Sequence, residues 1–408
     1  MMYSLLSLII LILPSTPNIQ VYFEEDTLSK KLAYFISNAQ YSLDICFHQF
    51  YDYEVIDSTL SAWNRGVKVR VITEHDYINY NGTQELEDAG IPVIDEGIGG
   101  NSTDHRMHNK FIIRDFRDQD TTNNAVWVGS FNASGYTHAD NAILVKSYAL
   151  SRIFEAEFNQ MWGDTGDTPN GVYALTGSNK HDECPFHQVN VDGTLLEAYF
   201  SPYNRIQNHI LDYINLAQSE IDFLMFTFTN YAIYDAMGMR FMNDSVMVYG
   251  VLDYDLEHDW NRDAYNYFNQ HNIPVVWDNY DSGHGSLLHD KVMIVDDSIV
   301  FMGSYNFTLR ADTSNDESCV IIHSPEIATL YKNEFTKLYY EEVNEQSPHN
   351  LCRNKPVILK SNDLLRLLQH KSFTILRPDG SIIHNLYNIK GVVFLKSDKT
   401  WQKLLIIR

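Results

Sequence analysis

The chain has few cysteines, few basic residues, and no long hydrophobic run in its interior. Four cysteines among 408 residues are too few for a disulfide scaffold. Lys and Arg number 30 against 53 Asp and Glu, which gives a net charge of −23. Such an acidic chain repels polyanions at long range, which argues against a nuclease with a broad basic footprint but still allows a local basic cleft. No segment after the N-terminal region has the length and apolar character of a transmembrane helix.

The N-terminal region contains a short apolar run, Leu5 to Leu13, followed by Pro14-Ser-Thr-Pro17. The run is well below the ~20 residues that span a bilayer, and it fits the apolar core of a secretory signal peptide. The basic residues that usually precede such a core are missing, so an uncleaved anchor or a first β-strand are the alternatives. We expect residues 1–19 to be a signal-peptide-like segment and the protein to be secreted or extracytoplasmic.

One pair of motifs occurs twice in the chain. The first copy reads His108-Asn-Lys110-Phe-Ile-Ile-Arg-Asp115 and is followed by Gly129-Ser130-Phe-Asn132. The second copy reads His289-Asp-Lys291-Val-Met-Ile-Val-Asp296 and is followed by Gly303-Ser304-Tyr-Asn306. A single His-x-Lys carries no information, but two matching copies, each followed by Gly-Ser-x-Asn, indicate a duplicated functional unit.

The duplication extends beyond these motifs. Ser42-Leu-Asp44 recurs as Glu220-Ile-Asp222, and Gly90-Ile-Pro-Val93 recurs as Asn272-Ile-Pro-Val275, in the same order. Two copies indicate a duplicated domain, since a solenoid needs about three or more repeats. Val- and Ile-rich runs alternate with helical stretches, which favours βαβ units and strands buried on both faces.

This pattern resembles the phospholipase D superfamily, whose members are phosphodiesterases with one such motif in each half. The resemblance covers about residues 20–345. It implies an α/β fold of two repeated α-β-α sandwich halves with mainly mixed or parallel sheets, related by a pseudo-two-fold axis and sharing one active-site cleft. It also implies a metal-independent reaction through a covalent phosphohistidine, with one motif histidine as the nucleophile and the other as the general acid/base.

The sequence therefore divides into four expected segments. They are the leader-like residues 1–19, a first half at 20–175, a second half at 176–348, and a basic extension or small module at 349–408. From Arg353 onward there are 11 Lys and Arg against three Asp and Glu, so this tail carries +8 and the rest of the chain −31. The tail could pack on the acidic body by charge complementarity, and a lipid-surface or nucleic-acid role is the alternative.

Strand periodicity separates the motif residues into two groups. Side chains alternate faces along a strand, so a strand over 108–115 points His108 and Lys110 to one face and Asp115 to the other. The same parity applies to the second copy. We therefore predict that Asp115 and Asp296 are structural partners on the far side, while the rest line one cleft: His108, Lys110, Ser130, Asn132, His289, Lys291, Ser304 and Asn306.

The predicted cleft residues suit phosphoryl transfer without a metal or other cofactor. The lysines Lys110 and Lys291, with the amides of Asn132 and Asn306, can stabilise charge on the non-bridging oxygens. One imidazole can attack phosphorus, which splits one difficult step into two. The other can protonate the leaving alcohol and then activate water.

The choice of nucleophile rests on an acidic residue. In related two-domain enzymes, an acid that follows Gly-Ser-x-Asn in one half orients the histidine of the other half. Glu317 fits this place and would orient His108, whereas alignment of the two halves puts Asn141 in the corresponding position, with Asp140 as an alternative acid. A carboxylate stabilises the imidazolium, so we predict that His108 is the nucleophile and His289 the acid/base.

The substrate is open between two classes. A phospholipid at a membrane surface, cleaved at its head-group phosphodiester, is the first expectation. An endonuclease is the alternative, because Met107-His-Asn-Lys-Phe is also similar to the nuclease-type branch. Cardiolipin synthases fit less well, since they carry N-terminal membrane helices. Both motifs lie in one chain, so we expect a monomer with an internal pseudo-dimer.

The connector between the halves contains His181-x2-Cys184-x2-His187, which resembles metal ligation only loosely. We expect no metal there from the spacing alone. Cys184 and Cys352 both lie in polar connectors and could form a disulfide in an exported protein. The sequence leaves that pairing open.

Overall fold

The computed structural model describes residues 17–23, 27–136, 138–254, 258–278, 287–345, 357–360, 374–376, 391–397 and 400–407. Residues 1–16 of the expected leader and Cys352 of the expected disulfide lie outside these ranges. Contacts between residues divide the chain into two units, Met1–Tyr339 and Tyr340–Arg408. Both copies of the motif lie in the first unit.

The first half of this unit alternates strands and helices. Its elements are β1 (Ile19–Phe23), α1 (Leu28–Ser37), β2 (Ser42–Phe47), α2 (Tyr53–Asn64), β3 (Lys68–Thr73), α3 (Asn81–Asp88), β4 (Val93–Asp95), β5 (Lys110–Arg114), β6 (Ala125–Gly129), β7 (Asn141–Lys146) and α4 (Tyr148–Trp162). Short 3-10 turns follow β3, β4 and α4 at His75–Tyr77, Ile98–Gly100 and Gly177–Asn179.

The second half repeats this order after one added strand, β8, and inserts a short helix, α8. Its elements are β8 (Gln188–Val191), β9 (Thr194–Ser201), α5 (Ile206–Leu216), β10 (Glu220–Met225), α6 (Tyr231–Asp244), β11 (Met247–Asp253), α7 (His258–Gln270), β12 (Val275–Asp278), β13 (Lys291–Val295), β14 (Ile299–Gly303), α8 (Leu309–Thr313), β15 (Glu317–His323) and α9 (Pro325–Glu345). The predicted duplication and the α/β class are confirmed.

Each half contains one mixed sheet. The strand orders are β1-β7-β6-β5-β2-β3-β4 and β12-β11-β10-β13-β14-β15-β9-β8. Pairing is parallel along β2-β3-β4 and β10-β11-β12 and antiparallel elsewhere in the two sheets. The motif strands occupy equivalent central places, with Phe47 opposite Lys110 and Met225 opposite Lys291.

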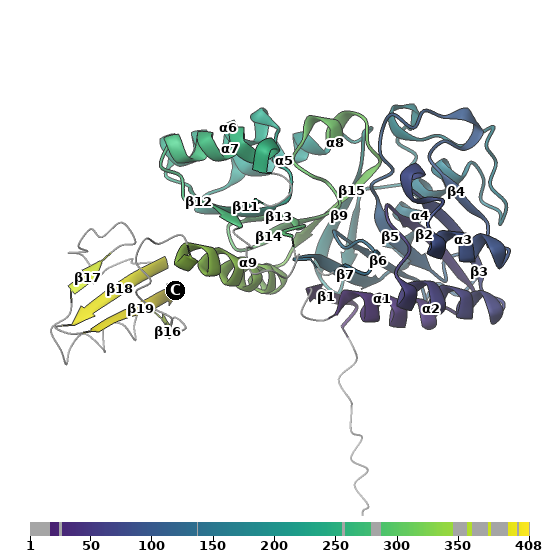
Figure 1. Ribbon diagram of the computed structural model, residues 1–408, viewed down its shortest axis with the longest axis horizontal. Helices are drawn as coiled ribbons and strands as arrows, with labels where there is room; N and C mark the ends of the chain where they lie inside the picture. Colours follow the sequence, from purple (N-terminus) through teal and green to yellow (C-terminus); the bar gives the residue numbers. More distant parts are fainter. Residues whose placement is uncertain are drawn as a thin grey trace, which may run out of the picture. The chain divides into compact units, whose positions relative to one another are not determined.

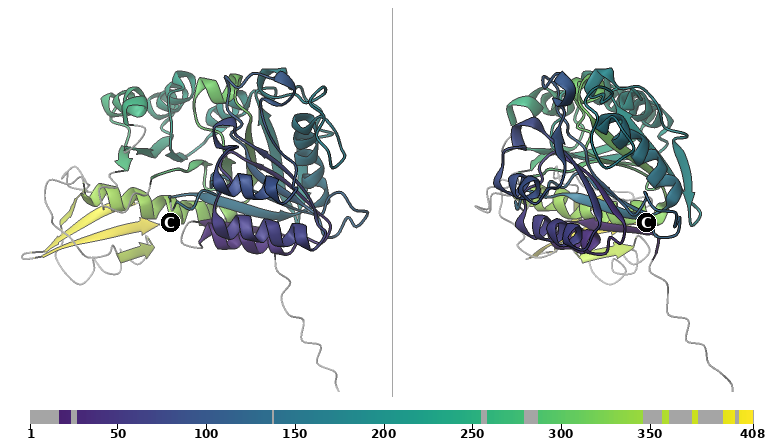
Figure 2. Two further views of the ribbon diagram at one scale, coloured as in Figure 1. Left: turned by 45° about the vertical axis from the view of Figure 1, so that its right-hand side comes forward. Right: turned by 90° about the vertical axis from the view of Figure 1, so that its right-hand side faces the viewer.

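Helices cover both faces of each sheet. On α1 the apolar residues Leu28, Leu32, Phe35 and Ile36 recur at helical spacing, and all four are buried in a core against one face of the first sheet. The helices α5, α6 and α7 cover one face of the second sheet in the same way. Figure 1 and the left view of Figure 2 show these teal helices on one side of that sheet and the green α9 on the other.

The two halves share a core where α4 packs between their sheets. Phe154 of α4 lies edge-on to Phe111 of β5, with ring centroids 5.0 Å apart, and edge-on to Phe200 of β9 at 5.1 Å. Tyr331 of α9 donates a hydrogen bond to the Asn141 side chain of the first half over 3.1 Å. These contacts hold the two sheets, and therefore the two motifs, in one arrangement.

The second unit contains one small sheet. Its strands are β16 (Val357–Lys360), β17 (Thr374–Leu376), β18 (Gly391–Ser397) and β19 (Thr400–Ile407), in the order β16-β19-β18-β17. All four strands lie within residues 349–408, the segment expected to be a basic extension or small module. Across the described parts of the chain, no helix has both the length and the apolar composition needed to cross a bilayer.

Candidate active site

The histidine of the first motif pairs with a carboxylate of the second half. Nδ1 of His108 lies 2.7 Å from Oε2 of Glu317, and both side chains are buried. The same Oε2 accepts a hydrogen bond from the Ser304 hydroxyl at 2.8 Å, and Asn315 donates to Oε1 at 3.1 Å. The carboxylate is therefore held in place from three directions, and Nε2 of His108 remains available for chemistry.

The histidine of the second motif pairs with a carboxylate of the first half. Nδ1 of His289 lies 2.8 Å from Oδ1 of Asp140, which also accepts a hydrogen bond from the Ser130 hydroxyl at 2.6 Å. Ser130 and Ser304 thus have equivalent roles. Each orients the acid that pairs with the histidine of the opposite half. The site consists of two carboxylate–imidazole pairs, each formed across the two halves.

Backbone hydrogen bonds place each histidine beside its acid. The His108 N–H donates to the carbonyl of Asp316 over 2.9 Å, and the His289 N–H donates to the carbonyl of Ala139 over 3.0 Å. Asp316 and Ala139 immediately precede the two acids. The isolated parallel bridges Met107–Asp316 and Ala139–Leu288 belong to the same contacts.

The alignment that placed Asn141 opposite Glu317 is wrong by one residue. The backbone N–H of Ser130 donates to the carbonyl of Asn141, and the N–H of Ser304 donates to that of Ser318, both over 3.0 Å. Asn141 is therefore equivalent to Ser318, and Asp140 to Glu317. The Asn141 amide instead donates to Oδ1 of Asp290 over 2.6 Å. Both histidines therefore pair with an acid, and the presence of the acid does not distinguish His108 from His289 as the nucleophile.

The two motif lysines are buried in the same site. The Lys110 ammonium donates to the carbonyl of His108 over 2.7 Å, and that of Lys291 donates to the carbonyl of His289. Burial lowers the pKa of Lys110 to about 7 and that of Lys291 to about 8, and the charge of Lys291 contributes to the shift of Lys110. Two cations are thus held together without enough negative charge around them, which favours binding of an anion.

The imidazoles and their acids differ between the two pairs. Burial lowers the pKa of His289 to about 3 and that of His108 well below its usual value, with the neighbouring lysines adding to both shifts. Burial also raises the pKa of Glu317 to about 7, despite the charge of Lys110. Burial opposes ionisation of Asp140 too, but the contacts with His289 outweigh it and lower the pKa of Asp140 to about 2. Asp140 is therefore the more firmly ionised acid.

The motif asparagines follow β6 and β14 on equivalent turns. Asn132 is nearly buried, and its side-chain oxygen has no hydrogen-bond partner among the described residues. The side-chain oxygen of Asn306 accepts from the N–H of Thr227 over 3.2 Å, which turns its amide nitrogen the other way. The amide nitrogen of each asparagine can donate a hydrogen bond to a ligand.

The motif aspartates have a structural role, as strand parity predicts. Asp115 accepts hydrogen bonds from the N–H groups of Gln40, Tyr41 and Ser42 at 2.7 to 3.1 Å. Asp296 does the same for residues 218–220 at 2.7 to 3.1 Å. Each aspartate therefore ties the end of its motif strand to the turn that enters β2 or β10.

Two aromatic residues that the motifs do not include also border the site. His48 directly follows β2 and lies edge-on to His108, with centroids 4.8 Å apart. Phe226 directly follows β10 and lies edge-on to His289, also at 4.8 Å. His48 lies outside the two motifs, but the wider duplication contains the signal, because Asp44 aligns with Asp222 and hence His48 with Phe226.

A cluster of tyrosines continues from His48. Tyr77 lies edge-on to His48 at 5.2 Å, and Tyr51 and Tyr80 stack 4.8 Å apart beside it. An open cavity of about 690 Å³ is lined by Tyr51, Asp52, Tyr53, Glu54, Asn79, Tyr80, Asn81, Gly82, Ser134 and Gly135. The cavity lining combines aromatic side chains with carboxylates.

Groups with metal-ligand spacing lie away from the motif histidines in the described residues. They are Asp182 with Cys184 and His187, and Glu220 with Asp222 and Asp297. The second group already contains a cation, because the Lys332 ammonium contacts all three carboxylates. The motif site itself contains two lysines in the place where a metal would supply positive charge.

Comparisons with known proteins match both halves. A family model described as "Cardiolipin synthase, PLD-like domain" matches residues 32–162 and 210–339. A protein named mitochondrial cardiolipin hydrolase from Chlamydomonas reinhardtii is 30% identical over 132 residues, which are 32% of this chain and 56% of that protein. One of the same name from Danio rerio is 32% identical over 143 residues, which are 34% of this chain and 58% of that protein.

The chain thus spans somewhat more than half the length of these relatives. Among solved structures, phosphatidylserine synthase from Haemophilus influenzae Rd KW20 is similar over 80% of this chain and 90% of its own, with a TM-score of 0.58 and 12% identity. At that identity the similarity shows the fold alone.

Proposed function

Because the chain belongs to the phospholipase D superfamily, we propose that it is a metal-independent phosphodiesterase that hydrolyses the head-group phosphodiester of a phospholipid through a phosphohistidine. The observation that carries the proposal is the pair of carboxylate–imidazole contacts formed across the halves, His108 with Glu317 and His289 with Asp140. Two imidazoles held in this way can divide nucleophilic and acid–base work in one site.

In the first step, Nε2 of His108 attacks phosphorus and the bond from phosphorus to the leaving alcohol oxygen breaks. His289 gives its Nε2 proton to that oxygen, so the alcohol leaves neutral. Glu317 accepts a hydrogen bond from the Nδ1–H of His108, and its charge stabilises the positive charge that develops on the ring. Lys110 and Lys291, with the amides of Asn132 and Asn306, bind the non-bridging oxygens.

In the second step, neutral His289 takes a proton from water. The resulting hydroxide attacks phosphorus, the phosphorus–nitrogen bond breaks, and His108 is released together with the phosphomonoester. Both imidazoles return to their starting states, so the cycle needs no external acid, base or oxidant.

The assignment of His108 as the nucleophile rests on the two acids. A nucleophilic imidazole must be neutral, whereas the general acid must be protonated. The low pKa of Asp140, about 2, keeps a full negative charge beside His289 and favours its imidazolium once a phosphate anion binds. The pKa of Glu317, about 7, leaves less negative charge beside His108. His108 is therefore the easier of the two to keep neutral.

Three observations support a phospholipid substrate. The matched relatives are named as hydrolases of cardiolipin, which is a phospholipid. The chain carries a net charge of −23, which repels an extended polyanion. Asp52 and Glu54 line the cavity among the tyrosines and oppose binding of further phosphates there.

A nuclease remains the second candidate, because one feature favours it. The stacked pair Tyr51 and Tyr80 presents aromatic faces beside the His48–His108 contact. Base stacking on such faces stabilises single-stranded nucleic acid without regard to sequence.

The test uses the purified full chain in excess EDTA, with vesicles containing cardiolipin and phosphatidylcholine on one side and single- and double-stranded DNA on the other. The His108→Gln variant removes the nucleophile. The matched control is His75→Gln, because His75 is half-exposed and pairs with Asp95 away from the motifs. We expect lipid cleavage that survives EDTA, falls by about 1000-fold or more in His108→Gln and is unchanged in His75→Gln.

Cleavage of DNA with intact lipid would favour the nuclease. Activity that disappears in EDTA but persists in His108→Gln would contradict the mechanism for either substrate.

We also propose that the protein is exported and works as a monomer. The carbonyl of Asn18 accepts a hydrogen bond from the N–H of Lys146, and β1 pairs with β7 from Ile19 onward. Cleavage before Asn18 would therefore leave the sheet intact. N-terminal sequencing of exported protein and light scattering in solution test these points. A retained Met1 would contradict cleavage, and the mass of a dimer would contradict the monomer.

A further inference from the structure

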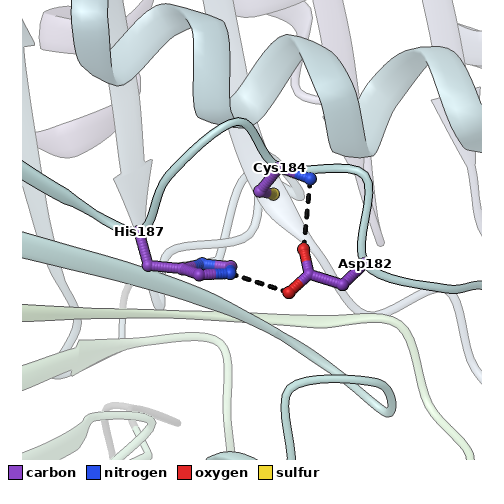
Figure 3. A group of neighbouring side chains, drawn as sticks. All are labelled: Asp182, Cys184 and His187. Atoms are coloured by element: carbon purple, nitrogen blue, oxygen red, sulfur yellow. Dashed lines mark hydrogen bonds and ion pairs between the residues drawn. The ribbon is translucent and has the colours of Figure 1, made fainter.

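The connector between the halves brings together a thiol, an imidazole and a carboxylate. The ligand atoms of Asp182, Cys184 and His187 all lie within 4.8 Å of one another. Figure 3 shows the carboxylate of Asp182 hydrogen-bonded to the Cys184 N–H and to the His187 ring. His181, the first residue of the His-x2-Cys-x2-His pattern, is not part of the group, because its ring pairs with Glu183.

The surroundings of His187 orient one ring nitrogen towards this group. Nδ1 lies 2.9 Å from the carbonyl oxygen of Ala198, which can only accept, so Nδ1 carries a hydrogen. Nε2 is then 2.8 Å from Oδ2 of Asp182. In a neutral ring, the lone pair of Nε2 would therefore face the carboxylate oxygen of Asp182. These two acceptors repel each other unless a positive charge lies between them. A backbone carbonyl that accepts from the far ring nitrogen is the usual support of a metal-bound histidine.

The cluster also differs from the other acidic group of the molecule. Glu220, Asp222 and Asp297 are neutralised by the Lys332 ammonium. Asp182 has no such partner among the described residues: its recorded contacts are the Cys184 N–H, the Asn204 amide and the His187 ring. Lys180, the nearest lysine in sequence, forms ion pairs with Glu157 and Asp316.

We propose that Asp182, Cys184 and His187 bind one Zn²⁺ ion, with water as the fourth ligand. Thiolate and imidazole together select Zn²⁺ over Mg²⁺ and Ca²⁺, which prefer oxygen ligands. Tetrahedral bonds of about 2.0 to 2.3 Å place ligand atoms about 3.3 to 3.7 Å apart, so only small side-chain rotations are needed. On binding, the thiol loses its proton to solvent.

The position of the cluster indicates a structural role. Cys184 Sγ lies 3.8 Å from the carbonyl of Ile153 on α4, while His187 stacks on Tyr199 of β9 with centroids 5.1 Å apart. The loop that carries the cluster therefore contacts an element of each half. A bound ion would fix the connector where the two halves meet, without taking part in the motif chemistry.

The experiment measures zinc in the full chain after incubation with ZnCl₂ and extensive dialysis, and the absorption spectrum after substitution with Co²⁺. Wild type should retain one Zn²⁺ per chain and show a thiolate-to-Co²⁺ charge-transfer band. In Cys184→Ser the band should vanish, and Cys184→Ser, His187→Gln and Asp182→Asn should each bind zinc about 100-fold or more weakly. Asp182→Asn changes a partly exposed side chain, so it keeps the test decisive if another variant fails to fold.

His181→Gln is the matched control, because His181 is a neighbouring, exposed histidine outside the cluster. It should bind zinc as wild type does. EDTA should lower the melting temperature of wild type and of His181→Gln but not that of His187→Gln. Wild type without retained zinc would overturn the site. Equal loss of zinc in His181→Gln would overturn the ligand set. Neither result bears on the proposed activity.

Discussion

The carboxylate of Asp140 lies 2.8 Å from Nδ1 of His289, although 149 residues separate the two in the chain. The reciprocal contact joins Glu317 to His108 over 2.7 Å and 209 residues. Each histidine thus receives its acid from the opposite half. Neither half can complete a carboxylate–imidazole pair alone, which is a physical reason for both copies to retain their motif.

The first prediction concerns Asp140 itself. Asp140→Asn should lower kcat by about 100-fold to 10,000-fold, because an amide neither stabilises the imidazolium of His289 nor holds the productive tautomer. Asp140→Glu should recover part of the activity. Steady-state kinetics on a phosphodiester measures both effects.

The matched comparison for this prediction is Asn141→Asp. It should give no gain in kcat and should lower the melting temperature, since a second carboxylate would face Asp290. Normal activity in Asp140→Asn together with a gain in Asn141→Asp would restore the register expected from sequence.

The second prediction separates the two histidines. A phosphodiester with a phenolate leaving group of low pKa needs little protonation, so His289→Gln should still form the phosphoenzyme. It should release a burst of about one equivalent of phenolate and then stall, with turnover about 100-fold to 10,000-fold slower than wild type. His108→Gln should give no burst. Rapid-mixing absorbance detects the burst, and the opposite pattern would make His289 the nucleophile.

The third prediction concerns pH. Lys110 and Lys291 lose their protons as the pH rises through about 7 and about 8. Because their charges bind the phosphate, kcat/KM should begin to fall as the pH rises above about 7 and should fall more steeply above about 8. Under saturating substrate, the fall in kcat should move to higher pH, since a bound anion raises the pKa of both lysines. A kcat/KM that stays level up to about pH 10 would show that both lysines remain charged in the free protein.

The fourth prediction assigns the motif aspartates to stability. Asp115→Ala leaves three backbone N–H groups without their acceptor at a buried position, so the free energy of unfolding should fall by about 3 kcal/mol. Asp296→Ala should cost less, about 1–2 kcal/mol, because water can reach that more exposed position. Urea unfolding gives both values. Under folding conditions, kcat should change by less than about twofold; a large loss of kcat at full stability would place these aspartates in the chemistry.

The fifth prediction concerns a buried ion pair beneath the first sheet. The Arg70 guanidinium donates to Asp44 over 2.5 Å and to Glu155 of α4 over 2.9 Å. Arg70→Met should lower the free energy of unfolding by about 3–5 kcal/mol, because it removes the guanidinium shared by two buried carboxylates and leaves Asp44 with Arg117 alone. Arg262→Met, at an exposed pair with Asp259, should cost less than about 0.5 kcal/mol. Equal costs in urea unfolding would contradict the role of burial.

The one-residue misalignment of Asn141 with Glu317 has a structural cause. Ser130 and Asp140 are 10 residues apart, whereas Ser304 and Glu317 are 13 apart, because the short helix α8 lies between them. An alignment that matches Asp140-Asn141 with Asp316-Glu317 is therefore shifted by one residue from the structural equivalence. Only the hydrogen bonds of Ser130 and Ser304 reveal which residue faces the histidine.

The contact between His48 and His108 could not be predicted from the sequence, for a different reason. The strand before His48 repeats as β10, so the equivalence of His48 with Phe226 was already present in the sequence. Its edge-on contact with His108 was not, because the strand β5 that pairs with β2 could have been placed at several sheet positions. Strand order depends on packing between distant segments, which local patterns do not encode.

The sequence alone determined the duplication, the α/β class and the motif residues, because repeated spacing and strand alternation are local properties of the chain. It also indicated Glu317 as the partner of His108. Only the tertiary structure decided that Asp140 holds His289, that His48 and Phe226 border the imidazoles, and that Asp182 replaces His181 beside Cys184. Each of these depends on the backbone direction at a loop or on contact between segments far apart in the chain, and such contacts form only when the two halves pack together.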